Sequence, residues 1–417
     1  MPGDLIDVLF DELGRRFPGF RKGAAIAALV VLILIVGFGL YALSSLSNSR
    51  TLSGLRESSA PGVRPAIERG GTVFESLWSA EIGTIQDLAL MRPDRESPLQ
   101  LLALSRRTVS RFDPQGRLLS EIEVPRGTAR LIADVQGRLG FFLAASSESY
   151  WKWQAMGYVA QAHHLTAIDP HGRTLWIYTL SADNSSSPFE VVLAAGDGDR
   201  GVQILVDVGA RIVCLDTAGR EVWSMPDQFR SWTQVDSEGH DRGVVLVLRP
   251  AGQNLEVAAV GADRRLTPHA LLERRSISAW HVARMAEHAE PTIVTLAVSS
   301  TPDAAGKMPE SFEVYSMTGA PIGRTTLPWP TRPIVIRPLG TIDTDGDGVR
   351  AWIAAGDDGV LYLFSADARD QEAHHTGVYI RRLTVVPMSE SGDWLILGTE
   401  RGLQVWRRRA NFASSVD

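Results

Sequence analysis

The hydrophobic positions of this chain follow one pattern near the N-terminus and another in the remainder. Residues 23–44 contain the run GAAIAALVVLILIVGFGLYAL, which carries no charge. A helix needs about 20 apolar residues to cross the ~30 Å hydrocarbon core of a bilayer. We therefore predict a transmembrane helix here that anchors the chain in a lipid bilayer. A cleaved signal peptide is the alternative, although the run is long for one and Tyr41-Ala42-Leu43-Ser44 is a poor cleavage site.

The charges beside this run predict its orientation. Arginine and lysine residues cluster at 15–22, just before it, whereas serine and asparagine follow it directly. Positive residues concentrate on the cytoplasmic side of a membrane helix. We expect residues 1–22 to be a cytoplasmic segment and the body to lie in the periplasm, at the inner (cytoplasmic) membrane of a bacterium. Residues 45–69, rich in Ser, Gly and Pro, are expected to form a linker.

From residue 70 to residue 410 the pattern changes to short apolar strands separated by turns. Its clearest unit is a strand, an Asp-x-x-Gly turn and a strand with Trp, as in LTAIDPHGRTLW at 165–176 and RIVCLDTAGREVW at 211–223. Asp accepts hydrogen bonds from nearby backbone N–H groups, and Gly adopts the positive φ that closes the turn. Two more strands precede each such pair. Four strands over roughly 45–55 residues are typical of a propeller blade.

Counting these units predicts the architecture. The third strand of the unit recurs at 108–112, 165–168, 212–215, 255–260, 312–315, 361–364 and 403–406. We predict an all-β, seven-bladed β-propeller over residues 70–410, followed by a polar tail at 411–417. Six or eight blades are the alternatives, because the weaker copies are easily miscounted.

The last unit lacks a fourth strand, and the N-terminal part of the repeat region supplies a candidate. Residues 71–78 read GTVFESLW, which has the pattern of an orphan fourth strand that ends in Trp. We predict that this strand completes the last blade, since borrowing a strand from the other terminus removes an open sheet edge.

Composition narrows the classes of function. The net charge is −6 over 417 residues with acids and bases mixed, so no basic face for nucleic acid is expected. The one cysteine, Cys214, lies in an apolar run and is expected to be a buried small hydrophobe. No Ser-His-Asp arrangement, phosphate-binding loop or zinc motif supports a hydrolase or a nucleotide enzyme. We therefore expect no catalytic residues.

An acidic loop is the candidate metal site. Asp343, Asp345 and Asp347 alternate in the sequence DTDGDG at 343–348. A curled loop can direct three alternating carboxylates inward, where oxygen ligands suit Ca²⁺. Ala351 stands at the ninth position of the loop and no Glu follows at the twelfth, so backbone carbonyls and water would complete the coordination. We predict a structural calcium site of modest affinity, with an empty acidic turn as the alternative.

An aromatic insert is the candidate partner-binding surface. The segment SESYWKWQAMGYVAQAHH at 147–164 breaks the rhythm of the second unit and contains Tyr150, Trp151, Trp153, Met156 and Tyr158. Aromatic residues and Met are enriched at protein interfaces. We predict that this connection is exposed and binds a partner protein. The alternative is an insert that folds back over its own blade.

The histidine pairs and the remaining tryptophans are given structural interpretations. The pairs 163–164 and 374–375 have no familiar metal-binding spacing and are interpreted as loop histidines without a ligand role. Tryptophans within strand patterns, such as Trp352 and Trp406, are expected to pack in the core or between blades.

The Asp-x-x-Gly turns followed by Trp resemble the repeats of quinoprotein-like (PQQ-like) propellers, and the loop at 343–348 is similar to the acidic loop of FG-GAP repeats. Membrane-anchored members of this group commonly act as docking platforms. The resemblance implies a non-enzymatic scaffold or accessory subunit that docks onto a membrane protein complex through propeller loops. One alternative is a quinone-cofactor dehydrogenase, although that class carries a vicinal cysteine pair and this chain has one cysteine. A ligand-binding sensor or adhesin is the other.

Overall fold

The computed structural model describes residues in the second of two compact units, Met1–Arg64 and Pro65–Asp417. The described residues are 74–152, 158–181, 190–195, 202–207, 211–226, 231–235, 244–260, 265–273, 276–286, 289–298, 310–327, 339–356, 359–388 and 392–408. The predicted cytoplasmic segment, transmembrane helix, linker and tail lie outside them. Within the described ranges, no helix has the length and apolar character that a membrane span requires.

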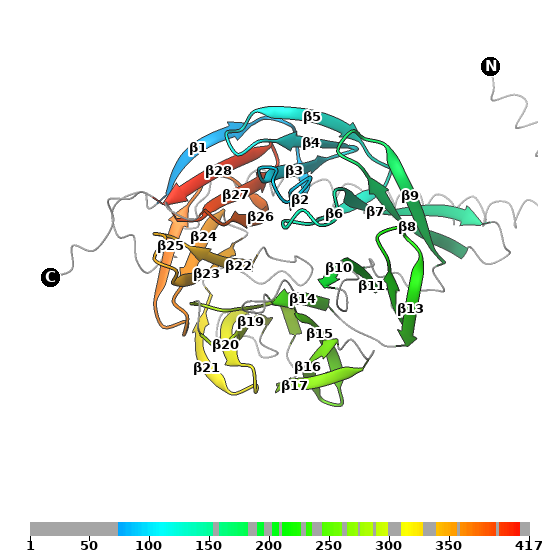
Figure 1. Cartoon of the computed structure of the whole chain (residues 1–417). Coiled ribbons are helices and arrows are strands. Elements are labelled where there is room, and N and C mark those ends of the chain that lie inside the picture. The colour runs from blue at the N-terminus through cyan, green and yellow to red at the C-terminus, as the bar shows by residue number, and fades with distance from the viewer. Residues whose placement is uncertain are drawn as a thin grey trace, which may run out of the picture. The chain divides into compact units, whose positions relative to one another are not determined.

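The described strands form seven antiparallel sheets of four strands each (Figure 1). From the inner to the outer strand, blades 1 to 4 contain β2 (Ile85–Met91), β3 (Gln100–Ser105), β4 (Thr108–Phe112) and β5 (Leu118–Glu123); β6 (Thr128–Ala133), β7 (Phe142–Lys152), β8 (Tyr158–Ile168) and β9 (Thr174–Ser181); β10 (Glu190–Ala195), β11 (Val202–Asp207), β12 (Arg211–Leu215) and β13 (Glu221–Pro226); and β14 (Ser231–Val235), β15 (Val244–Ala251), β16 (Asn254–Val260) and β17 (Leu266–Leu272). Blades 5 to 7 contain β18 (Ser276–Ala283), β19 (Thr292–Val298), β20 (Glu310–Ser316) and β21 (Pro321–Thr326); β22 (Leu339–Asp343), β23 (Arg350–Ala355), β24 (Val360–Phe364) and β25 (Gln371–His375); and β26 (Ile380–Val386), β27 (Trp394–Thr399), β28 (Leu403–Arg408) and β1 (Phe74–Ala80).

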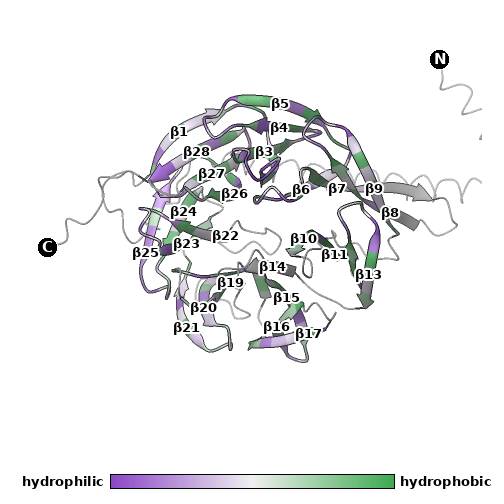
Figure 2. Cartoon of the chain, in the orientation of Figure 1, coloured by the Kyte–Doolittle hydropathy of each residue, from purple (hydrophilic) through white to green (hydrophobic). Residues whose placement is uncertain are grey.

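The position of a strand in its blade explains its sequence. Every residue of β3 and of β24 is buried, because these middle strands have a neighbouring blade on each face and therefore read as continuous apolar runs. The outer strands β13 and β21 alternate between exposed and half-buried residues along their length. Figure 2 shows this difference within one blade, where β23 and β24 are largely hydrophobic and β25 is not.

The inner strands close into a ring. Each contacts the inner strand of the next blade, from β2 through β6, β10, β14, β18, β22 and β26, and back to β2. The chain is therefore a seven-bladed all-β propeller, as the repeat count predicts.

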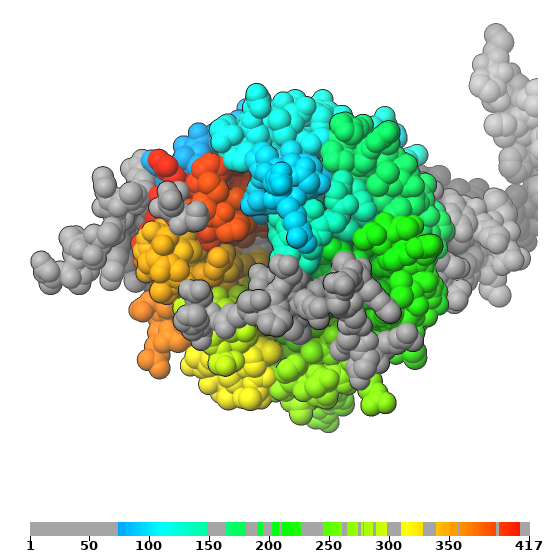
Figure 3. Space-filling view, viewed as in Figure 1, coloured from blue at the N-terminus to red at the C-terminus, as the bar shows by residue number. Residues whose placement is uncertain are grey.

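The N-terminal strand completes the last blade, as predicted. β1 pairs antiparallel with β28, with Trp78 opposite Val405 and Ser76 opposite Trp406. Glu75 and Arg407 form an ion pair at 2.6 Å across this seam. The two ends of the propeller accordingly lie side by side, the blue of β1 against the red of β28 (Figure 3).

The Asp-x-x-Gly turns have the hydrogen bonds that the sequence predicts. Asp113 Oδ1 accepts from the backbone N–H of Gln115 at 3.1 Å and of Arg117 at 2.8 Å. Gly116 closes the turn with a φ of +84°. Asp169 and Asp216 form the same contacts in blades 2 and 3.

The tryptophans of the outer strands pack on the turns of the next blade. Trp176 of β9 lies against Gly219, where a Cβ atom would come within 2.5 Å of the indole ring, and its Nε1–H donates to the carbonyl of Thr217 at 2.9 Å. Trp78 of β1 makes the same contact with Gly116. These contacts lock consecutive blades together. The core role predicted for Trp352 is confirmed, since this side chain is fully buried.

Candidate functional site

The two candidate sites lie at opposite ends of the propeller. Consecutive strands of a blade run in opposite directions, so the first-to-second and third-to-fourth connections share one end and the second-to-third connection lies at the other. We call these the turn end and the hairpin end. The acidic loop joins β22 to β23 and lies at the turn end, whereas residues 153–157 join β7 to β8 at the hairpin end.

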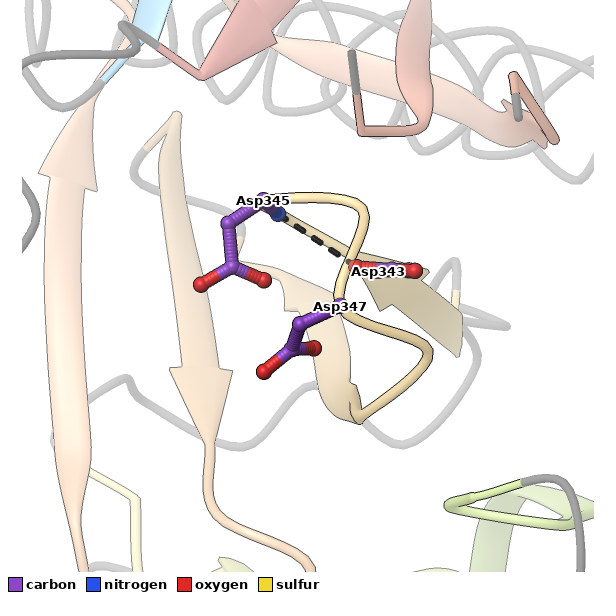
Figure 4. A group of neighbouring side chains, drawn as sticks. All are labelled: Asp343, Asp345 and Asp347. Carbon is purple, nitrogen blue, oxygen red and sulfur yellow. Dashed lines mark hydrogen bonds between the residues drawn. The ribbon is translucent and has the colours of Figure 1, made fainter. Parts of the chain in front are cut away.

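The acidic loop brings its three carboxylates together. Each of Asp343, Asp345 and Asp347 offers an oxygen, and these atoms lie within 4.8 Å of one another (Figure 4). Asp343 also holds the loop in shape, because its carboxylate accepts from the N–H of Gly346 at 2.8 Å and of Gly348 at 3.0 Å. Both glycines have positive φ, which lets the chain curl around this residue.

A fourth aspartate, which the sequence analysis missed, fixes this loop to blade 7. Asp393 is buried, and its Oδ2 accepts from the N–H of Asp343 at 2.9 Å while its own N–H donates to the Asp343 carbonyl at 2.7 Å. Gly392 packs against the backbone of Thr344. The sequence signal for this support is weak, since it consists of a Gly-Asp pair just before an apolar strand.

The charge at the loop favours a cation. The pKa of Asp345 is raised, first by loss of solvent around its carboxyl group and then by the negative charge of Asp347 beside it. A bound cation would relieve this repulsion. Carboxylate oxygens are ligands that Ca²⁺ prefers, so the chemistry of the loop fits that ion.

The aromatic insert extends two strands of blade 2 and does not form the predicted connecting loop. β7 and β8 pair continuously from Phe142 and Ile168 out to Lys152 and Tyr158. In the described residues, β6 pairs with β7 only as far as Ser146. Similarly, β9 pairs with β8 only from Ala162 onward. The stretches 147–152 and 158–161 are therefore a two-stranded ribbon, visible beyond β9 in Figure 1.

The structure places the predicted partner-binding residues only in part. Tyr150 and Trp151 lie on β7 opposite Ala160 and Val159, and Tyr158 begins β8. Trp153 and Met156 lie outside the described residues. All five therefore belong to the ribbon or to its tip.

Two histidines stand where the ribbon leaves the sheet. His163 and His164 are strand residues of β8, and His374 and His375 belong to β25, so their interpretation as loop histidines is wrong. His163 is buried, with its Nδ1 at 2.7 Å from the Ser147 hydroxyl. Burial, and then the charge of His164, lowers the pKa of His163. The strand ladder extends through this region, which single-residue patterns do not reveal.

A further cavity at the turn end was not anticipated. Arg92, Arg95, Val135, Gln136 and Arg138 line a volume of about 360 Å³ between blades 1 and 2. The Arg138 guanidinium is paired with Asp134 at 3.0 Å, so part of the positive charge is neutralised. The sequence signal is a fourth Asp-x-x-Gly-Arg motif, at 134–138, which here joins a first strand to a second strand.

Comparison with known proteins supports the fold and leaves the family open. No family model matches the chain, and no curated protein does. A crystal structure of BBS1N in complex with ARL6DN matches with a TM-score of 0.56 and 11% sequence identity, over 82% of this chain and 99% of that chain. BamB from Moraxella catarrhalis matches with a TM-score of 0.42 and 16% identity, over 80% of this chain and 100% of that chain. The Neurospora crassa Pan2 WD40 domain matches with a TM-score of 0.47 and 10% identity, over 81% of this chain and 97% of that chain. The likeness to BBS1N agrees with the propeller fold.

Proposed function

We propose that this chain is a non-enzymatic scaffold or accessory subunit, anchored in a bacterial inner membrane, that presents its propeller in the periplasm and docks onto a membrane protein complex. The observation that carries the proposal is the β7–β8 ribbon, which stands beyond the four-stranded sheet of blade 2. Closure of the propeller does not require it, because the ring of inner strands is complete without residues 147–162.

Physical chemistry suggests what such a ribbon needs. An isolated two-stranded ribbon is marginally stable in water. This one contains Tyr150, Trp151, Trp153, Met156 and Tyr158, which are residue types that interfaces favour. A partner that covers the ribbon would supply the missing packing. The BBS1 propeller was crystallised with ARL6DN, so a propeller of this kind can hold a protein partner.

The membrane part of the proposal rests on residues 1–44. The uncharged run at 23–44 would contact the lipid bilayer, and the basic cluster at 15–22 would hold the N-terminus in the cytoplasm. A phosphatase that is active only in the periplasm, fused after Asp417, should be active in cells. An inactive but stable fusion would contradict the orientation.

The docking proposal is tested by substituting the ribbon tryptophans. The double variant Trp151→Ala/Trp153→Ala, extracted gently from membranes, should no longer migrate with a larger complex, whereas the wild-type chain should. The melting temperature of the purified variant should be unchanged, because the ring does not include the ribbon. A matched variant on the same tip, Gln154→Ala, should keep the complex.

Two results would count against docking at the ribbon. The first is a wild-type chain that migrates alone after gentle extraction. The second is a double variant that unfolds, since this would make the ribbon part of the core.

We also propose that Asp343, Asp345 and Asp347 hold a structural Ca²⁺. The ion would stiffen the connection between β22 and β23, because it would bridge carboxylates that otherwise repel. Calcium titration should raise the melting temperature of the wild-type chain, since a ligand that binds only the native state stabilises it. Asp345→Asn/Asp347→Asn should abolish the rise, whereas Asp370→Asn, an exposed aspartate of the same blade, should keep it. A melting temperature that is insensitive to calcium would remove the metal.

A further inference from the structure

The outer strand of each blade has an open edge that faces away from the ring. Such an edge pairs with other chains unless charges, proline or bulges protect it. Of the seven outer strands that the structure describes, six contain a charged residue or a proline. They are Glu75 in β1, Glu121 in β5, Glu221 in β13, Pro268 in β17, Pro321 in β21 and Glu372 in β25.

The outer strand of blade 2 is the exception. β9 has the sequence TLWIYTLS over eight residues, with neither a charge nor a proline. Ile177 is 60% exposed, which is the largest value among the exposed large apolar side chains of the described residues. Leu175 beside it is 50% exposed. Figure 2 shows a hydrophobic stretch on this strand at the outer rim.

The other face of β9 is held in place by blade 3. Trp176 donates to the Thr217 carbonyl at 2.9 Å, and the Tyr178 hydroxyl donates to Glu221 at 3.0 Å. The β-bulge at Leu175 has counterparts in β5 and β13, so it does not distinguish this strand. From Trp176 to Ser181 the ladder is regular. The edge is therefore a rigid strand that is ready to accept another.

We infer that β9 pairs with β9 of a second copy of this chain, antiparallel about a twofold axis at Ile177. An occupant of this edge must itself be an extended, uncharged strand with an open edge, and among the described outer strands only β9 meets that description. In this arrangement Ile177 faces its own counterpart and Leu175 faces Thr179 of the other copy. No like charges meet, and the same patch is used by both copies, as a twofold interface requires.

The inference goes beyond the proposed function, because it needs no partner complex and uses the rim of blade 2, not the ribbon. Two four-stranded blades would join into one continuous sheet across the two copies. Failure of this pairing would leave the docking proposal standing, and the reverse also holds.

Disulfide trapping tests the register. Cys214 is the single native cysteine and is buried, so an introduced thiol reports alone. Facing residues of an antiparallel pair have Cα atoms about 4.5–5.5 Å apart, which is within disulfide range. Mild oxidation of the full-length Ile177→Cys chain in detergent should therefore give a covalent dimer. Thr179→Cys, on the same face, would lie about 13 Å from its counterpart and should stay monomeric. Equal cross-linking of the two variants, or none in either, would overturn the inference.

A charge placed on the edge gives a second test. Ile177→Lys should convert the full-length chain from dimer to monomer in sedimentation experiments, with an unchanged melting temperature because the side chain is exposed. Val222→Lys is the matched control, since Val222 is 45% exposed on the neighbouring outer strand β13, and it should remain dimeric. A wild-type chain that is monomeric at its highest soluble concentration would overturn the inference.

Discussion

At the scale of single residues, His281 joins three blades. It belongs to the inner strand β18 of blade 5, and its Nδ1 lies 3.2 Å from the Thr233 hydroxyl in blade 4. Its ring also meets that of Trp352 in blade 6 edge to face, with centroids 6.3 Å apart. Burial lowers the pKa of His281 to about 4. The neutral imidazole is therefore the form that the fold accepts.

This residue should make stability depend on pH. The pKa of His281 in the folded chain lies below the ordinary value of 6.5, so the unfolded chain binds the proton first as the pH falls. The free energy of unfolding should decrease between pH 6.5 and about pH 4, and be insensitive to this group above that range. Urea unfolding of the wild-type chain at a series of pH values measures this slope.

The contribution of His281 is isolated by substitution. His281→Gln should give a shallower slope, although not a flat one, because burial also lowers the pKa of His163 and of His374. His171→Gln, at an exposed turn position, should keep the wild-type slope. An unchanged slope in His281→Gln would show that the imidazole is not strained by burial.

At the scale of elements, the blades are joined where an outer strand meets the next turn. Gly219 has a φ of +75° and lies against Trp176 of the preceding blade. The turn therefore needs glycine for two reasons, namely its backbone conformation and the space that the indole ring occupies.

Substitution of Gly219 should separate these two reasons. Gly219→Ala would put a Cβ atom 2.5 Å from the Trp176 ring and also strain the backbone. Gly377→Ala shares the positive φ but would meet no atom within 4 Å. We expect Gly219→Ala to lower the free energy of unfolding by about 2 kcal/mol more than Gly377→Ala does, as crowding in packed sites does. Equal losses in the two variants would mean that the tryptophan moves aside without strain.

At the scale of the whole propeller, closure of the ring involves a buried aspartate. Asp87, in the inner strand of blade 1, accepts from the Leu131 N–H of blade 2 at 2.8 Å and from Arg382 of blade 7 at 3.2 Å. The pKa of Asp87 is raised, because burial outweighs the favourable charges of Arg130 and Arg382. Its carboxylate thus stabilises the ring mainly through the hydrogen bonds it accepts.

Removing this carboxylate should loosen the closing blades. Asp87→Ala leaves the Leu131 N–H without its acceptor, and an unsatisfied buried group of this kind lowers stability by about 2 kcal/mol. Asp87→Asn keeps an acceptor oxygen and should lose less. Chemical denaturation of both variants measures the difference, and a larger loss in Asp87→Asn would show that the charge matters more than the hydrogen bonds.

Much of the architecture was predictable because a repeated pattern averages over weak signals. The third strand predicted at 108–112 has those bounds in the structure, and the others agree within a few residues except β8. That strand begins at Tyr158, seven residues before the predicted start at 165, because it includes one side of the ribbon. Its extra ladder depends on pairing with β7 and has no counterpart in the repeat.

The sequence by itself determined the number of blades, the turns and the identity of the closing strand, since each follows from local periodicity and turn chemistry. The candidate aspartates at 343, 345 and 347 were also visible, because they are adjacent along the chain. Only the tertiary structure decided that Asp393 supports them, that His281 joins three blades and that β9 is an edge open to another strand. These features depend on contacts between residues far apart in sequence or on position within a sheet, and no local pattern records either.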